Sequence, residues 1–132
     1  AVLANAIARA VRDFNPRLRL FGLAGSALLA AGSALGLSVV AEGFVDRRYR
    51  ADGSLQPRRE PDAVIDDVEL ATAQALGLAR DGEVLALDGH KVQLQVDTLC
   101  LHGDGAHAAQ LACRVRAALE AAGMRIAAPE PA

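Results

Sequence analysis

Residues 17–41 read RLRLFGLAGSALLAAGSALGLSVVA, and this stretch decides the fold class. It begins with alternating polar and apolar residues, which is typical of a β-strand over about residues 17–24. Ser26 is a favourable N-cap and Gly36 a favourable C-terminal residue, so the small residues between them predict a short helix. A second strand is predicted over residues 37–41, where two valines are adjacent. Strand, helix and strand in this order predict a parallel crossover unit.

The same stretch also has to be tested as a membrane span. Residues 20–41 carry no charge and are long enough to cross a bilayer as a helix. They contain four glycines and three serines, however, and the helix-ending signals described above. The crossover unit explains these residues better than a continuous helix does, so we expect no membrane span.

The chain before this stretch has helical periodicity. Its apolar residues are spaced to fall on one face of a helix that ends at the Asn15-Pro16 stop signal: Val2, Leu3, Ala6, Ile7, Ala10 and Val11. The sequence starts at Ala1 rather than at a methionine and enters this helix with no strand before it, so we expect further sequence upstream.

The remaining elements are predicted from caps, turns and alternation. We expect a polar loop over residues 43–61, a helix from Asp66 to about Arg80, and a hairpin of residues 83–87 and 92–96 around Asp88-Gly89. A strand begins at 98–101, a helix follows from Asp104 or Gly105 to about Ala122, and Gly123 ends it before a last strand at 124–127.

Three parallel strands with covering helices and an inserted β-hairpin predict a single α/β domain over residues 1–132. A closed parallel barrel needs about eight strands, and so short an open sheet leaves its edges exposed. We therefore expect the chain to be one portion of a larger barrel or sheet.

Composition limits the possible functions. The 132 residues are 52% hydrophobic and 23% charged, which suits one globular domain with a core. With 14 basic against 16 acidic residues and 3% aromatic residues, the chain has neither a basic stripe nor stacking surfaces, so we expect no nucleic-acid binding. Cys100 and Cys113 lack metal-finger spacing, and we expect free thiols in a reducing, cytoplasmic compartment.

One candidate cluster follows the strand at 98–101. Cys100 and His102 share a face of the extended chain. His102 could be a general acid or base, a metal ligand or a structural histidine. Asp104 could orient His102, bind a metal or only cap the following helix.

A second candidate cluster follows the strand at 37–41. Glu42 and Asp46 are carboxylates suited to proton transfer or metal binding, and Arg47 and Arg58 could hold an anionic substrate group. An ion-pair network that pins the loop is the alternative, and Tyr49 could either cover a pocket or pack.

The two clusters are predicted to form one site, because side chains at the C-terminal ends of parallel strands meet on one rim. His90 and His107 are predicted to be solvated surface groups. No loop ending in Gly-Lys-Ser/Thr is present, so any use of ATP would depend on other residues or other chains.

These motifs resemble the LamB/YcsF family in order and spacing. The resemblance rests on Glu42-x-Phe44-x-Asp46-Arg47-x-Tyr49, then Asp52-Gly53-x-Leu55 with Arg58, and then Cys100-x-His102-Gly103-Asp104. It covers nearly the whole chain. The family's N-terminal motifs, Asn-Cys-Asp, His-Ala-Gly-Asp and Lys-Pro-His-Gly, are absent, so the chain resembles the C-terminal half only.

The resemblance implies part of an irregular seven-stranded β/α barrel related to polysaccharide deacetylases. It also implies ATP-dependent hydrolysis of the 5-oxoproline lactam to glutamate, carried out with two partner subunits. The cofactors implied are ATP, bound through the complex, with a divalent metal as a possible addition. The isolated C-terminal half is then expected to be inactive. Glu42, Asp46, His102 and Asp104 are then the candidate catalytic residues, and Arg47, Arg58 and Tyr49 the candidate substrate-binding residues. The alternatives are a metal-dependent, deacetylase-like carbohydrate hydrolase and a non-catalytic binding subunit.

Overall fold

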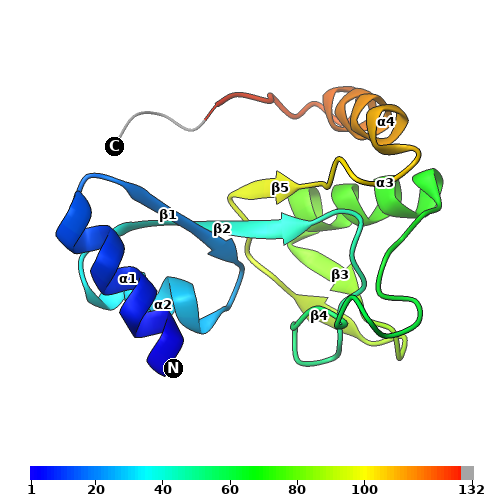
Figure 1. The fold of residues 1–132 in the computed structure, drawn as a ribbon. Coiled ribbons are helices and arrows are strands. Elements are labelled where there is room, and N and C mark those ends of the chain that lie inside the picture. The colour runs from blue at the N-terminus through cyan, green and yellow to red at the C-terminus, as the bar shows by residue number, and fades with distance from the viewer. Residues whose placement is uncertain (129–132) are drawn as a thin grey trace.

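The crossover unit predicted from residues 17–41 is present in the computed structural model, which describes residues 1–128. Strand β1 (Arg19–Leu23), helix α2 (Ala27–Ala34) and strand β2 (Ser38–Phe44) follow one another, and β1 pairs with β2 in parallel (Figure 1). The Ser26 hydroxyl accepts a hydrogen bond from the Leu29 N–H, and Gly36 ends the helix with a φ of +77°. Both predicted helix signals are therefore confirmed.

Strand β5 (Thr98–Cys100) completes a three-stranded parallel sheet in the order β1-β2-β5. Its register places Thr98 beside Glu42 and Cys100 beside Phe44. Strand β2 is longer than predicted, because it continues past Ala41 to Phe44 and uses these extra residues to pair with β5. The C-terminal end of the central strand, β2, therefore lies next to the C-terminal end of β5.

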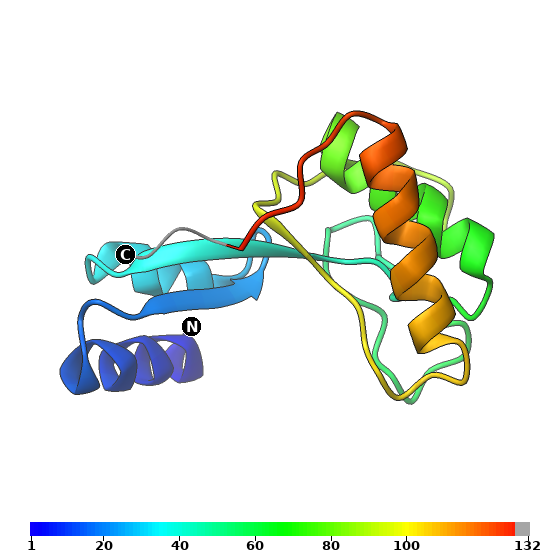
Figure 2. The same cartoon turned by 90° about the horizontal axis from the view of Figure 1, so that it is seen from above.

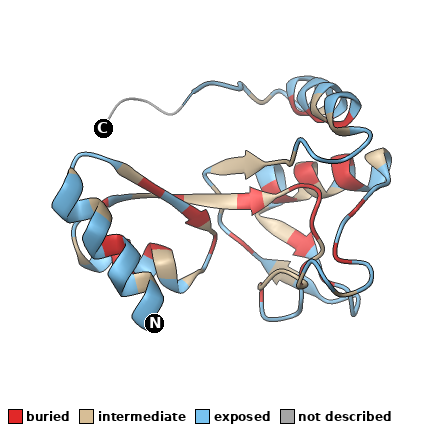
Figure 3. Cartoon of the chain, viewed as in Figure 1, coloured by how far each residue is buried: buried red, intermediate tan, exposed pale blue. Residues whose placement is uncertain are grey.

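The predicted helix at the start of the chain forms as α1 (Val2–Phe14) and lies against α2. Ala8 is fully buried, and Ala4 and Val11 are the partly buried residues beside it. Val2 and Phe14 are 86% and 84% exposed, and Figure 3 shows most of the helix in the exposed colour. The helix and its end before Pro16 are as predicted, but α2 covers only the part of its circumference around Ala8, so most of its apolar residues stay exposed.

The second half of the chain forms a layer of two helices beside the far end of the sheet. Helix α3 (Val68–Leu76) continues into a π-helical turn, η1 (Gly77–Asp81), and packs against α4 (Ala108–Ala121). Figure 2 shows α3 and α4 together at the opposite end of β2 from α1 and α2. Their shared core contains Val45, Ile65 and Leu111, together with Ala71, Ala75, Val115 and Leu119.

The predicted hairpin is confirmed. Strands β3 (Glu83–Leu85) and β4 (Lys91–Gln93) pair in antiparallel fashion, and Gly89 in the turn has a φ of +86°. Val84 and Leu94 turn inward and pack with Leu78 and Tyr49 in a second core cluster.

Two predicted helix starts were wrong. Helix α3 is capped by Asp67 and not by Asp66, because the Asp67 carboxylate accepts the Leu70 N–H at 2.9 Å. Helix α4 begins at Ala108, since Asp104 is held in a preceding turn by an ion pair with Arg58.

The predicted strand at 124–127 does not form. The Met124 N–H instead bonds back to the Leu119 carbonyl at the end of α4, where Gly123 has the expected positive φ. The end of the chain, residues 129–132, lies outside the described residues. Within residues 1–128, no helix is both long enough and apolar enough to cross a membrane.

Candidate active site

The two predicted clusters meet where β2 and β5 end. The last sheet hydrogen bond runs from the Val45 N–H to the Cys100 carbonyl at 2.9 Å. Beyond this bond the segments that follow β2 and β5 diverge, and these segments begin with Asp46 and His102. Their meeting follows from the parallel arrangement, which brings both C-terminal strand ends to the same rim of the sheet.

Asp46 and His102 form a closely held pair. The Asp46 carboxylate oxygens lie 2.9 and 3.0 Å from His102 Nδ1, and one of them also accepts the His102 backbone N–H at 2.9 Å. An ionised carboxylate only accepts hydrogen bonds, so Nδ1 carries a proton, and in the neutral ring Nε2 is the acceptor. The Asp46 side chain is 10% exposed and the His102 side chain 28% exposed. This geometry fixes the imidazole tautomer and leaves Nε2 able to take or give a proton.

The His102 ring is also supported from one face. Phe44 stacks on it with ring centroids 5.6 Å apart and an interplanar angle of 22°. The last residue of β2 therefore fixes the tilt of the imidazole, while Asp46 fixes its rotation.

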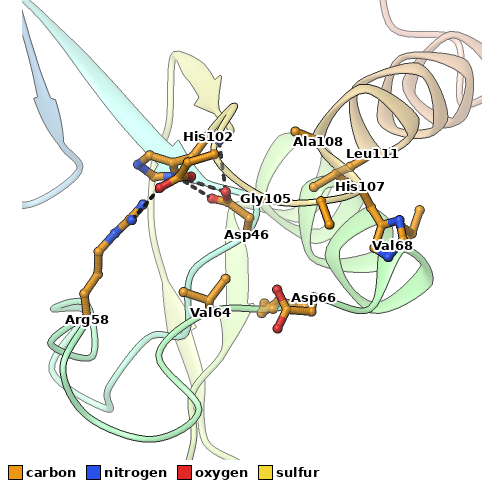
Figure 4. Close-up of a pocket in the computed structure, with 13 residues that line it drawn as sticks. Asp46, Arg58, Val64, Asp66, Val68, His102, Gly105, His107, Ala108 and Leu111 are labelled. Carbon is orange, nitrogen blue, oxygen red and sulfur yellow. Dashed lines mark hydrogen bonds and ion pairs between the residues drawn. The ribbon is translucent and has the colours of Figure 1, made fainter.

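A cavity of about 580 Å³ opens beside this pair (Figure 4). Its polar lining comes from Asp46, Arg58, Asp66, His102, Asp104 and His107, and its apolar lining from Val64, Ile65, Val68, Ala108 and Leu111. The cavity thus combines three carboxylates, one guanidinium and two imidazoles with an apolar wall.

Arg58 and Asp104 join two loops at this cavity. Arg58 Nη1 donates to Asp104 Oδ2 at 2.8 Å, and both side chains are exposed. This hydrogen bond is the main reason why the pKa of Asp104 is lowered and that of Arg58 is raised. Asp104 therefore does not cap α4 or contact His102 directly, although both of those roles were open from the sequence.

Arg47 and Tyr49, both predicted to bind substrate, do not line the cavity. The Arg47 guanidinium is buried and donates to the carbonyls of Ala63 and Gln56 at 3.1 and 2.7 Å. The Tyr49 side chain is fully buried, its hydroxyl accepts the Phe44 N–H at 2.7 Å, and burial raises its pKa to about 12. The structure gives both side chains contacts that hold the loop after β2.

Glu42, predicted to be catalytic, lies within β2 and does not line the cavity either. It is half-buried and close enough to Cys100 to influence it. Burial raises the pKa of the Cys100 thiol, and the negative charges of Glu42 and Asp46 raise it further. Cys100 and Cys113 are both free cysteines.

Sequence reasoning missed three residues near the site. Asp66 was predicted to be a helix cap but lines the cavity, and His107, which is exposed as predicted, lines it as well. Gln74 was not considered at all, because nothing in the sequence around it distinguishes it from a surface glutamine. Among the residues that the structure describes, no group of three or more His, Cys, Asp and Glu side chains is placed to hold a metal ion.

Comparisons with known proteins agree with the resemblance of the motifs. The model of the LamB/YcsF family matches residues 1–132. The 5-oxoprolinase A subunit of Neisseria meningitidis is 52% identical over 126 residues, which are 96% of this chain and 51% of that protein. The same subunit from Methylococcus capsulatus is 53% identical over 128 residues, 97% of this chain and 49% of that protein.

A solved structure also matches. The crystal structure of a lactam utilization protein from Thermus thermophilus has a TM-score of 0.84 and 42% sequence identity, over 93% of this chain and 49% of that one. The chain thus spans about half the length of the relatives that it matches.

The fold and the site together define an α/β protein with a histidine–aspartate pair at the C-terminal ends of parallel strands. Such a pair is typical of proteins that transfer protons to or from a bound molecule. With the family model matched over the whole chain, this protein belongs to the LamB/YcsF family.

Proposed function

We propose that this chain is the C-terminal half of the A subunit of a 5-oxoprolinase, and that the complete subunit hydrolyses the 5-oxoproline lactam to glutamate. The observation that supports this most strongly is the Asp46–His102 pair beside a cavity that has Arg58 and an apolar wall in its lining. The names of the relatives, a 5-oxoprolinase subunit in one case and a lactam utilization protein in the other, point to the same substrate class.

Lactam hydrolysis needs groups that act as general acids or general bases. Water oxygen bonds to the carbonyl carbon, the ring C–N bond breaks, and the nitrogen leaves with a proton. In this proposal His102 Nε2 moves a proton in one of these steps, because Asp46 holds Nδ1 protonated. Arg58, which now donates one hydrogen bond to Asp104, exchanges it for the substrate carboxylate, because a guanidinium binds carboxylates in general.

The described half is an open sheet, and we propose that the other half of the subunit closes it into the β/α barrel related to polysaccharide deacetylases. Three strands are too few to close a parallel barrel, which takes about eight. Residues 1–132 are then a single domain that forms the C-terminal portion of this barrel.

ATP and a divalent metal, both expected from the family, do not fit the residues of this half. The sequence has no phosphate-binding glycine loop, and a single arginine, Arg58, lines the cavity among residues 1–128. No cluster of metal-ligating side chains is formed by residues 1–128. We therefore assign ATP to the complex with two partner subunits and derive no step through either group. Two free thiols accord with a cytoplasmic protein.

The test is turnover of 5-oxoproline by the complete subunit with its partners. His102→Ala and Asp46→Ala are each expected to lower kcat by about 10²–10⁴-fold, the usual contribution of a positioned acid or base. His90→Ala, at the exposed hairpin turn, is the matched control and should leave kcat unchanged. Near-normal turnover in both site variants would refute the proposal, and zinc bound at full occupancy would favour the deacetylase alternative instead.

A further inference from the structure

The turn that carries Asp46 is fastened by one side chain from helix α3. Gln74 Nε2 lies 2.8 Å from the Phe44 carbonyl, 3.1 Å from the Val45 carbonyl and 2.9 Å from the Arg47 carbonyl. A primary amide has two N–H donors, so three carbonyls share them. No other side chain among the described residues makes as many hydrogen bonds to this turn.

These bonds fix the peptide groups on both sides of Asp46. Gln74 holds the carbonyl of Val45, just before Asp46, and that of Arg47, just after it. The carbonyl of Asp46 itself accepts the Ile65 N–H at 2.9 Å. With three successive peptide planes fixed, the direction in which the Asp46 side chain leaves the backbone is fixed as well.

Glutamine suits the task of holding these three carbonyls, and few other residue types would. A glutamate of the same length would point acceptor oxygens at three carbonyls, and an apolar residue would leave them without a donor beside the buried Val45. Asparagine keeps the amide but is one methylene shorter, so it cannot reach all three carbonyls from the same helix.

We propose that Gln74 is a positioning residue for the Asp46–His102 pair: by holding the turn at 44–47 it aims the Asp46 carboxylate at His102 Nδ1 and so sets the imidazole tautomer. Gln74 contacts neither His102 nor the cavity in the described residues, and it acts through the backbone of Asp46. That Gln74 contributes to catalysis rests on the proposed function, whereas its effect on the orientation of Asp46 does not.

The test reads the tautomer directly in this chain by ¹⁵N NMR of the histidine rings, at a pH where they are neutral. The chain has three histidines, so His102 can be assigned by His102→Gln. The wild type should show protonated Nδ1 and unprotonated Nε2. Gln74→Met should lower the ratio of Nδ1–H to Nε2–H tautomer several-fold, in the same direction as Asp46→Asn.

The matched control is Thr72→Val in the same helix. It removes a buried hydrogen bond from the Thr72 hydroxyl to the Val68 carbonyl without touching the turn at 44–47. It should lower thermal stability and leave the His102 tautomer at the wild-type ratio. A Gln74→Met protein that loses stability but keeps the wild-type tautomer would overturn the proposal.

If Gln74→Met does not fold, Gln74→Asn decides the question. It should give a tautomer ratio between those of the wild type and Asp46→Asn, and a wild-type ratio would overturn the proposal. Turnover by the complete subunit separates the two ideas: a shifted tautomer with normal kcat supports the positioning role while refuting the catalytic use of the pair.

Discussion

Alkaline pH should destabilise this fold through one side chain, Tyr49. It is the only tyrosine, and the chain has no tryptophan, so tyrosinate absorbance reports on this residue alone. Its side chain is fully buried, and burial raises its pKa from 10.0 to about 12. The folded protein therefore retains the phenolic proton over a pH range in which the unfolded chain releases it.

The sign and size follow from proton linkage. A folded-state pKa above the unfolded value gives stability that is fully present below pH 10 and is lost as the pH rises toward 12. Each pKa unit corresponds to about 1.4 kcal/mol, so two units give a loss of roughly 3 kcal/mol in the free energy of unfolding. That is a large part of the stability of an ordinary domain, which is about 5–15 kcal/mol.

The measurement is urea unfolding of the wild type and Tyr49→Phe from pH 8 upward. At pH 8 the variant should be less stable by about 1–3 kcal/mol, because the Phe44 N–H loses its acceptor. As the pH approaches 12 this difference should shrink toward zero. Cys100 and Lys91 also have raised pKa values and destabilise in the same direction, but they are present in both proteins and cancel in the difference.

A stability difference that stays constant over this range would refute the reasoning. So would a tyrosinate signal that appears at the ordinary pKa while the circular dichroism of the folded protein is unchanged.

Three further predictions concern other parts of the chain. Gly36→Ala should lower stability by about 1–2 kcal/mol in thermal unfolding although its Cβ would meet no atom, because the residue has a φ of +77°; an unchanged Tm would contradict this. The ion pair between Arg58 and Asp104 should stay closed at the ordinary carboxyl pKa and open only as the pH falls through the lowered pKa of Asp104. The carboxyl ¹³C shift of Asp104 follows this opening, and a titration at the ordinary value would contradict it. Phe14→Ser should change the free energy of unfolding by no more than about 0.5 kcal/mol, because the ring is exposed. Ala8→Leu should lower it by about 1–3 kcal/mol, because the larger side chain overpacks against α2. Equal effects of the two substitutions in denaturant unfolding would show that α1 packs differently.

Local signals in the sequence predicted the parts of the fold that depend on neighbouring residues. The crossover unit around Ser26 and Gly36 is specified by a cap and a left-handed glycine, and the hairpin by its Asp-Gly turn. The meeting of Asp46 and His102 was also predictable, because two parallel strands that end together must bring the following residues to one rim.

What the sequence did not reveal depends on contacts between distant segments. Arg47 and Tyr49 stand in the same polar run as Asp46, and only the path of the loop shows that they turn inward to Ala63 and Phe44. Gln74 is a similar case, since its partner at Phe44 lies 30 positions earlier in the chain. The exposed face of α1 could not be predicted because the periodicity shows that a helix is amphipathic without showing how much of it a neighbour covers.

The C-terminal ends of β2 and β5 meet in space but are far apart in the sequence, and this distance along the chain affects how the site folds. Strands β1 and β2 are joined by one short helix, so only a short loop has to close before they pair. Asp46 and His102 are 56 positions apart, so the loop between them must be closed at an entropic cost before they meet. The crossover unit therefore closes at a lower entropic cost than the Asp46–His102 pair, and the imidazole is oriented only once the longer loop has closed.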